Sequence, residues 1–202
     1  PVQEVGKVEK EEKMNELKVL SYDLRKHVVD MIIAGKGGHI GGDMSVMEIL
    51  VELYMKQMNI SPENKDLDNR DRFVLSKGHS VESYYAVLAK KGFFPMEEVI
   101  STFSQFGSKF IGHPNNKLPG IEMNSGSLGH GISVGVGMAL AARMNHQSYR
   151  TYVVLGDGEM AEGSNYEGMM AAGHYKLDNL CATVDLNRLQ ISGTTGQVMD
   201  SA

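Results

Sequence analysis

The chain has 202 residues, about the size of one ordinary domain with room for a sizeable buried core. With 42% hydrophobic and 22% charged residues, it belongs to the globular class of proteins and not to the disordered one. Its net charge of −5 provides no basic surface for nucleic acid, and no apolar stretch approaches the length of a membrane span. We therefore expect neither a nucleic-acid partner nor a membrane.

The chain has a single cysteine, Cys181, which excludes an internal disulfide. Because Cys181 lies inside an apolar run, the favoured interpretation is a small core residue. The N-terminus is charged and has no apolar segment of the secretory kind. These features predict a reduced, cytoplasmic protein.

Residues 1–13 are mostly Glu, Lys and Val, which predicts a charged tail or the frayed start of a helix. A single domain is expected over residues 14–202, incomplete at its C-terminus. From Met14 to Ala34, apolar residues recur at helical spacing, which predicts a long amphipathic helix. A glycine-rich run over 35–42 is expected to end it.

A second helix is expected over residues 45–58, with Ser45 as its N-cap and Glu48 completing a capping box. The apolar run that follows a polar loop predicts a strand. The elements expected in this part of the chain after the second helix are a strand over 72–76 and helices over 81–91 and 95–105.

The next expected helix, from Gly131 to about Asn145, also carries Gly135 and Gly137. Glycine is unfavourable inside a helix, so these residues make sense only if a neighbour packs very close. That neighbour could lie within the fold or across a subunit contact.

Two short apolar runs follow, one leading to Gly156 and the other from Leu180 to Leu186, with a helix-like segment between them. Strands that alternate with helices indicate an α/β fold: a doubly wound, mainly parallel sheet with helices on both faces.

Asp157 and Asn187 should therefore lie at the carboxyl ends of two strands joined by a crossover helix, which is where open α/β sheets bind ligands. A carboxylate and an amide there are hard oxygen ligands, suited to Mg²⁺ or Ca²⁺ with room for phosphate oxygens. Gly156 and Gly158 allow backbone amides to approach such phosphates. An ordinary strand-to-helix turn is the alternative.

Four of the seven histidines lie in glycine-rich loops, each after a predicted element. Imidazoles donate hydrogen bonds to phosphate and hydroxyl oxygens and transfer protons near neutral pH. A lone loop histidine is usually a surface residue, but four in such contexts indicate a function. They are His39, His79, His113 and His130.

With these segments in view, the chain resembles a transketolase, specifically the amino-terminal part that binds the diphosphate side of thiamine diphosphate. The resemblance covers residues 14 to 196 approximately. Several segments are weak alone, but their order and spacing are very specific. They are GHIGG (38–42), NRDRFVLSKGH (69–79), IGHP (111–114), GSLGHG (126–131), GDGEMAEG (156–163) with Glu167, and DLNRLQISG (185–193).

The resemblance implies a thiamine diphosphate cofactor and a divalent cation, Mg²⁺ or else Ca²⁺ or Mn²⁺. Asp157, Asn187 and the backbone carbonyl of Leu189 would hold the cation, which bridges two phosphate oxygens. His79 would contact the diphosphate and counts among the catalytic residues, and Gly158 would donate its amide to the phosphate.

It also implies that the backbone of Gly126, Ser127 and Leu128 runs against the two rings of the cofactor. His39 and His113 would face the substrate and hydrogen-bond the oxygens of the donor sugar. Further acidic residues match positions at the family's subunit interface, near the catalytic glutamate of the partner. These are Glu162, counted here with the cofactor-binding residues, and Glu167.

Two positions depart from the family's pattern. The common His-Pro-Gly is here His39-Ile40-Gly41, and a frequent Gln is here His130. Both look like variation within the two-chain transketolases, and either could shift substrate preference.

The family transfers a two-carbon ketol unit from a ketose phosphate to an aldose phosphate, as in the pentose phosphate pathway. It activates the cofactor with a glutamate from a pyrimidine-binding domain, which follows the segment seen here. We therefore expect either a fragment of a longer chain or, as the match to split forms favours, the amino-terminal subunit of a split transketolase. Its expected partners are sugar phosphates and a pyrimidine-binding chain, in a homodimer or heterotetramer.

Other functions remain open. Deoxyxylulose-phosphate synthases and the α-subunits of 2-oxo acid dehydrogenases use the same cofactor, although the paired loops of His39 and His113 favour a ketose donor. A non-catalytic cofactor-binding or interaction module is the alternative from outside the enzymes. Such a module should have lost some metal or histidine positions, and this chain keeps them.

Overall fold

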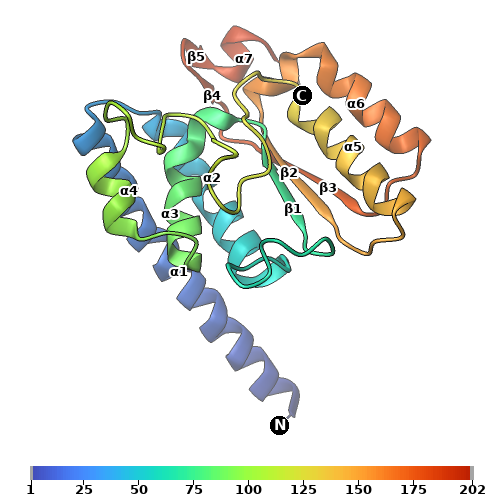
Figure 1. The fold of residues 1–202 in the computed structure, drawn as a ribbon, viewed down its shortest axis with the longest axis horizontal. Coiled ribbons are helices and arrows are strands. Elements are labelled where there is room, and N and C mark those ends of the chain that lie inside the picture. Colours follow the sequence, from blue (N-terminus) through green and yellow to red (C-terminus); the bar gives the residue numbers. More distant parts are fainter. Residues whose placement is uncertain (1, 201–202) are drawn as a thin grey trace.

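A computed structural model describes residues 2–200, with side chains described from residue 13 onward. At its centre is a three-stranded parallel sheet, in the order β1 (Arg72–Leu75), β2 (Thr151–Gly156) and β3 (Leu180–Asp185). Helices lie on both sides of these strands (Figure 1). The α/β fold expected from the alternation of elements is therefore confirmed.

One face of the sheet is covered by the N-terminal helices, because alternate side chains of β1 and β2 point toward them. Phe73, Leu75 and Val154 belong to the same buried core as apolar residues of these helices. The helices on this side are α1 (Val2–Gly35), α2 (Ile40–Glu52) with a π-helical turn η1 (Leu53–Gln57), α3 (Val81–Lys91) and α4 (Met96–Thr102).

The opposite face is covered by α5 (Gly131–Met144) and α6 (Gly163–His174). Val74, Val153 and Leu155, the strand residues that point this way, form a second buried cluster with Ile132 of α5. Both faces of β1 and β2 are therefore buried, as in most parallel sheets.

The long first helix follows the predicted apolar pattern. Leu24, Val28 and Met31, at helical spacing, are buried in the main core. The helix begins at Val2, so it runs through the segment 1–13 that was expected as a charged tail or a frayed helix start. That expectation concerns side chains that, up to residue 12, lie outside the described ones.

The predicted start of the second helix was wrong. Helix α2 begins at Ile40, with His39 as its N-cap, and Ser45 lies inside it. Ser45 Oγ instead donates to the carbonyl of Gly42 and to Asp185, and Glu48 pairs with Arg25 at 2.5 Å. Tertiary packing outweighs the low helix propensity of the glycine run, because a Cβ on Gly42 would lie against the ring of His79 at 3.4 Å.

Helix α4 is shorter than the predicted 95–105, whereas α3 and α5 match their predicted ranges closely. Helix α3 ends at Gly92, which has a φ of +100° and donates its amide to Leu88 and Ala89 carbonyls. Of the glycines in α5, Gly135 meets the sheet: a Cβ there would lie 2.5 Å from Val153 Cγ2. The close neighbour of the glycine-rich helix is thus within the fold, although Gly137 has open space.

The expectation that Cys181 is a core residue was wrong, because its side chain is exposed. Cys181 lies on β3, which pairs only with β2 among the described residues and so forms an edge of the sheet. Val184 of the same strand is also exposed. After β3 come the hairpin strands β4 (Leu189–Gln190) and β5 (Gly193–Thr194), and α7 (Thr195–Val198).

Among residues 2–200, no helix combines the length and the apolar character that crossing a membrane requires.

Candidate functional site

Three of the four loop histidines lie together near the carboxyl ends of the strands. His39 precedes α2, His79 lies in a 3₁₀ helix η2 (Gly78–Ser80) just after β1, and His113 belongs to the loop after α4. The ring centroid of His39 is 5.5 Å from that of His79 and 5.9 Å from that of His113, edge-on in both cases. We call these three residues the histidine cluster.

Burial favours the neutral form of two of these imidazoles. Desolvation, followed by the charges of Lys77, His39 and His113, lowers the pKa of His79 to about 4. Desolvation also lowers the pKa of His113, an effect that His39 reinforces and the nearby Glu82 opposes. A neutral imidazole can both donate and accept a hydrogen bond, as contacts to hydroxyl or phosphate oxygens require.

The glycine-rich loop 125–131 lies directly against the histidine cluster. Gly126 has a φ of +143°, and a Cβ there would lie 2.7 Å from Cδ2 of His113. Because both the conformation and the contact exclude a side chain, the backbone of Gly126, Ser127 and Leu128 passes within contact distance of the cluster.

His130, the fourth loop histidine, does not join the cluster. Its side chain is exposed, and Nδ1 lies 3.1 Å from the carbonyl oxygen of Leu128 and 3.3 Å from Ser127 Oγ. These contacts keep His130 on its own loop.

The second part of the site is the turn that follows β2. The register of β2 and β3 pairs Gly156 with Asp185, which places Asp157 and Asn187 at the same edge of the sheet. Asp157 Oδ2 accepts a hydrogen bond from the amide of Arg188 at 2.5 Å, across the two strand ends. The juxtaposition predicted from the strand–helix–strand pattern is confirmed.

The oxygen atoms here fit a hard divalent cation. Asp157 is 4% exposed, and Asn187 Oδ1 accepts from the amide of Leu189 at 2.9 Å, in a tight turn with Arg188 at a φ of +62°. Within residues 13–200, no group of three or more His, Cys, Asp or Glu side chains is arranged to hold a metal. A cation in this part of the chain would therefore need amide and carbonyl oxygens, the types that Mg²⁺ and Ca²⁺ accept.

A buried polar network, which the sequence did not reveal, holds Asn187. Lys77 is 1% exposed and donates to Asp185 Oδ2 at 2.5 Å and to the Gly42 carbonyl at 3.1 Å. Ser45 donates to the same Asp185 oxygen at 2.6 Å, and Asn187 Nδ2 donates to Ser45 Oγ at 3.2 Å. One signal was available: a lysine directly after a buried strand needs an acidic partner.

A second missed residue is Glu159, which is 3% exposed and ties three segments together. Its carboxylate accepts from the amide of Gly129 at 2.8 Å, from the amide of Gly156 at 3.0 Å and from the hydroxyl of Ser76. Glu159 thus fixes the loop 125–131 to the turn after β2. No pattern in the sequence signals this role, because an acid at the start of a helix usually points into solvent.

Glu162 and Glu167, the two acids predicted to face a partner subunit, are both exposed. Glu162 is the N-cap residue of α6, and its Cβ lies 2.7 Å from where a Cβ on Gly129 would be. It therefore borders the loop 125–131, and neither acid belongs to the histidine cluster.

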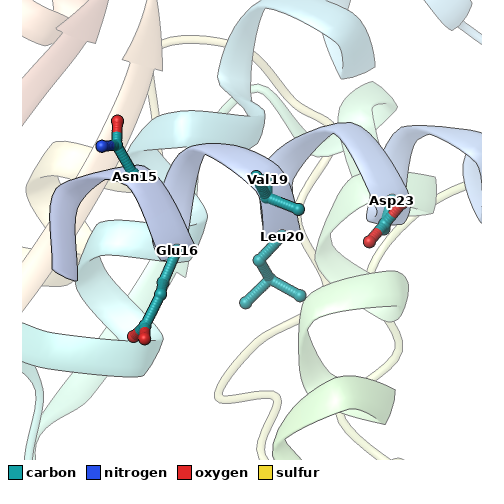
Figure 2. A pocket seen from close by; sticks show the side chains of 5 residues that line it. All are labelled: Asn15, Glu16, Val19, Leu20 and Asp23. Carbon is teal, nitrogen blue, oxygen red and sulfur yellow. The ribbon is translucent and has the colours of Figure 1, made fainter. Parts of the chain in front are cut away.

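The largest pocket among the described residues lies elsewhere, along α1. Its volume is about 530 Å³, and none of the predicted site residues lines it. Figure 2 shows that all its lining side chains come from one helix: Asn15, Glu16, Val19, Leu20 and Asp23. A depression along a single helix brings no polar groups together from different elements, so the candidate site is the one at the strand ends.

With this geometry described, the comparison with protein families decides the identity. The transketolase family model for the thiamine diphosphate binding domain matches residues 16–202. This chain belongs to the transketolase family. The matched segment contains the histidine cluster, the loop 125–131 and both strand ends of this transketolase domain.

Individual relatives agree with this assignment. One of the two subunits of an apulose-4-phosphate transketolase of Phocaeicola vulgatus is 53% identical over 183 residues, which are 91% of this chain and 65% of that protein. A 6-deoxy-6-sulfo-D-fructose transketolase subunit of a Clostridium species is 44% identical over 162 residues, 80% of this chain and 58% of that protein. The transketolase of Campylobacter jejuni has the same fold, with a TM-score of 0.85 and 32% identity over 91% of this chain and 30% of that chain.

The chain therefore spans between 58% and 65% of the length of these two relatives. The family and the fold are established, and the domain is one that binds thiamine diphosphate. The roles of the individual site residues stay predictions.

Proposed function

We propose that this chain supplies the thiamine-diphosphate- and Mg²⁺-binding side of a transketolase, which transfers a two-carbon ketol unit from a ketose phosphate to an aldose phosphate. The observation that supports this most strongly is the histidine cluster beside the paired strand ends of Asp157 and Asn187. Neutral hydrogen-bonding groups for a sugar and hard oxygens for a cation lie at one edge of the sheet.

The proposed cation site consists of Asp157, Asn187 and the backbone carbonyl of Leu189, with Ca²⁺ or Mn²⁺ as possible substitutes for Mg²⁺. His79 contacts the diphosphate, and Gly158 donates its backbone amide to a phosphate oxygen. The amide of Gly158 points inward already, since it donates to Asp157 Oδ1 at 2.8 Å.

When bound, thiamine diphosphate supplies the electron sink that allows the carbon–carbon bond beside a ketose carbonyl to break. The chain's own residues orient the reactants. His39 and His113 hydrogen-bond the carbonyl and hydroxyl oxygens of the donor sugar and exchange protons with them. The loop 126–128 presents its backbone to the two rings, because Gly126 leaves no side chain in that space.

A second chain or domain completes the site in this proposal, and it supplies the glutamate that activates the cofactor. Two relatives are named as transketolase subunits, which supports a separate partner chain in a dimeric or heterotetrameric assembly in the cytoplasm. Glu162 and Glu167 are exposed and available to face that partner.

The test is a two-carbon transfer assay from xylulose 5-phosphate to ribose 5-phosphate, with Mg²⁺ and thiamine diphosphate. Apulose 4-phosphate serves as a second donor, because a relative carries that sugar in its name. We expect turnover by the complex that co-purifies from the native source and none by the isolated chain. Turnover by the isolated chain would refute the need for a partner, and no turnover with any ketose would refute the proposed reaction.

His113→Asn, with His174→Asn as a matched control, tests the residue assignment. His174 is exposed at the end of α6 and contacts Tyr175 instead of the cluster. We expect the His113 variant to lose transfer activity by about 100-fold or more, and the control to keep it.

Product analysis separates the related thiamine diphosphate enzymes. With pyruvate in place of the ketose, a deoxyxylulose-phosphate synthase or a 2-oxo acid dehydrogenase would release carbon dioxide, whereas a transketolase would not. Cofactor binding without any turnover would instead favour a non-catalytic module.

A further inference from the structure

Two acidic side chains lie buried beneath the histidine cluster, and the proposed reaction does not use them. Asp43, in the first turn of α2, and Glu82, in the first turn of α3, are each 0% exposed. They hydrogen-bond to each other. Each retains one carboxyl oxygen without a conventional hydrogen-bond partner, namely Asp43 Oδ2 and Glu82 Oε2.

No cation neutralises this pair within the described part of the chain. Of the ion pairs among residues 13–200, none includes either carboxyl group. The nearest charged and titratable groups on the surrounding elements have other partners or face the cluster. They are Arg25 of α1, Lys77 after β1, Asp185 of β3, Tyr85 of α3, and the three clustered histidines.

Two buried carboxylates in contact cannot both be ionised without a large electrostatic cost, so one proton between them is the stable arrangement. Burial, followed by the charge of Glu82, raises the pKa of Asp43 to about 8. The ionised member is stabilised by backbone amides at the helix N-termini, since Asp43 Oδ1 accepts from Ser83 at 2.7 Å.

The pair is connected to the cluster through Glu82. Its Oε1 accepts a hydrogen bond from the backbone amide of His39 at 3.2 Å. His39 has no side-chain cap and lies at the start of α2, so this bond is what anchors its backbone. We propose that Asp43 and Glu82 share a single proton and act together as positioning residues for His39.

The shared proton does not depend on the proposed function, whereas the positioning of a substrate-facing His39 does. Asp43→Asn and Glu82→Gln separate charge from shape, because each amide keeps a proton donor between the two groups but removes the titration. Glu97→Gln is the matched control, since Glu97 is exposed on α4. Glu82→Ala removes the contact to His39 altogether.

The first measurement is the unfolding midpoint of the full chain, in complex with its partner, from about pH 6.5 to about pH 9. A raised carboxyl pKa means that the unfolded state binds fewer protons there, so stability falls as pH rises through this window. Starting near pH 6.5 avoids the opposite slope from His79, whose lowered pKa makes stability rise with pH below that value.

We expect the midpoint of the wild-type protein and of Glu97→Gln to fall by several degrees across this window. The midpoint of Asp43→Asn should fall less, so that the two curves converge or cross. Parallel curves for the wild-type protein and Asp43→Asn would overturn the shared proton.

The second measurement is hydrogen exchange at the His39 amide, followed by mass spectrometry or NMR. Protection in the wild-type protein and in Glu82→Gln, with loss in Glu82→Ala, is the expected pattern. Equal exchange in all three would overturn the positioning role. Neither measurement requires transfer activity, so a failure of the proposed reaction would be distinguishable from a failure of this inference.

The third measurement links the pair to turnover. The alkaline limb of kcat/KM should move to higher pH in Asp43→Asn and stay in place in Glu97→Gln. An unchanged alkaline limb in an active Asp43→Asn enzyme would show that the pair stabilises the fold without positioning the substrate-facing histidine.

Discussion

The part of the chain from α1 to β2 and the part from β3 to α7 are held together in different ways. In the first part, apolar side chains of the N-terminal helices and the strands form one continuous buried core. In the second part, large apolar side chains are exposed, and the segment is tied back mainly by polar contacts. The exposed residues are Val184, Leu186, Leu189, Ile191, Val198 and Met199.

This difference divides the candidate site. The histidine cluster rests on the well-packed part, whereas Asn187 and Leu189 belong to the polar-tied part. The ties run through Lys77, Asp185 and Ser45, and through the bond from the Arg188 amide to Asp157. Apolar packing therefore fixes the groups that would face the sugar, and a few hydrogen bonds fix those that would hold the cation.

The largest effect is expected for Lys77→Met, which removes the central tie. It leaves Asp185 buried without its cation, and such a loss destabilises proteins by about 3–5 kcal/mol. Urea unfolding measures this, and calorimetry with Mg²⁺ and thiamine diphosphate should show weaker binding as well. The double variant Lys77→Met/Asp185→Leu is the control, because replacing both partners costs less than removing one. A single variant as stable as the wild-type protein would show that the ion pair does not hold β3.

A smaller effect, with the opposite balance, is expected for Val28→Ala in the apolar part. Val28 is fully buried on α1, so the loss of two methyl groups and the remaining cavity should cost about 2 kcal/mol in unfolding free energy. Cofactor affinity should not change. Val19→Ala is the matched control, because Val19 lies on the same helix and is 59% exposed. Weaker cofactor binding by Val28→Ala would contradict the proposed division between the two parts.

Ser45→Ala is expected to act on cation affinity more than on stability. It removes the hydroxyl that accepts from Asn187 Nδ2, and loss of such a supporting contact typically weakens metal binding by about 10-fold or more. Titration with Mg²⁺ in the presence of thiamine diphosphate measures this. Ser101→Ala is the control, since Ser101 donates only to carbonyls of its own helix. If both variants bind Mg²⁺ like the wild-type protein, Ser45 does not orient Asn187.

The sequence predicted the packed part of the fold better than the open part. Apolar spacing located the buried side of α1 and the ranges of α3 and α5, because these helices each bury a periodic face. It failed at α2, whose glycine run is helical through tertiary contacts with η2. It also failed at Cys181, because an apolar run does not reveal whether its strand has a neighbour on each side.

The site could be predicted as far as strand ends and loops determine it. The strand–helix–strand pattern was enough to place Asp157 beside Asn187, since parallel strands end at a common edge. The supporting residues Lys77, Glu159 and Asp43 could not be predicted. Their partners are distant in sequence, so only the folded chain shows that these charged side chains are buried together.

The smallest perturbation tests whether β3 is open in the protein as purified. Cys181 is the only cysteine and is exposed on this strand, so a neutral thiol reagent reports on it alone. We expect the folded isolated chain to react at a rate close to that of the chain unfolded in denaturant, because exposure controls access to the sulfur. The same reaction on the complex with its partner provides the comparison. Strong protection in the isolated chain would mean that the strand is covered, and the contrast between a packed and an open part would then fail at β3.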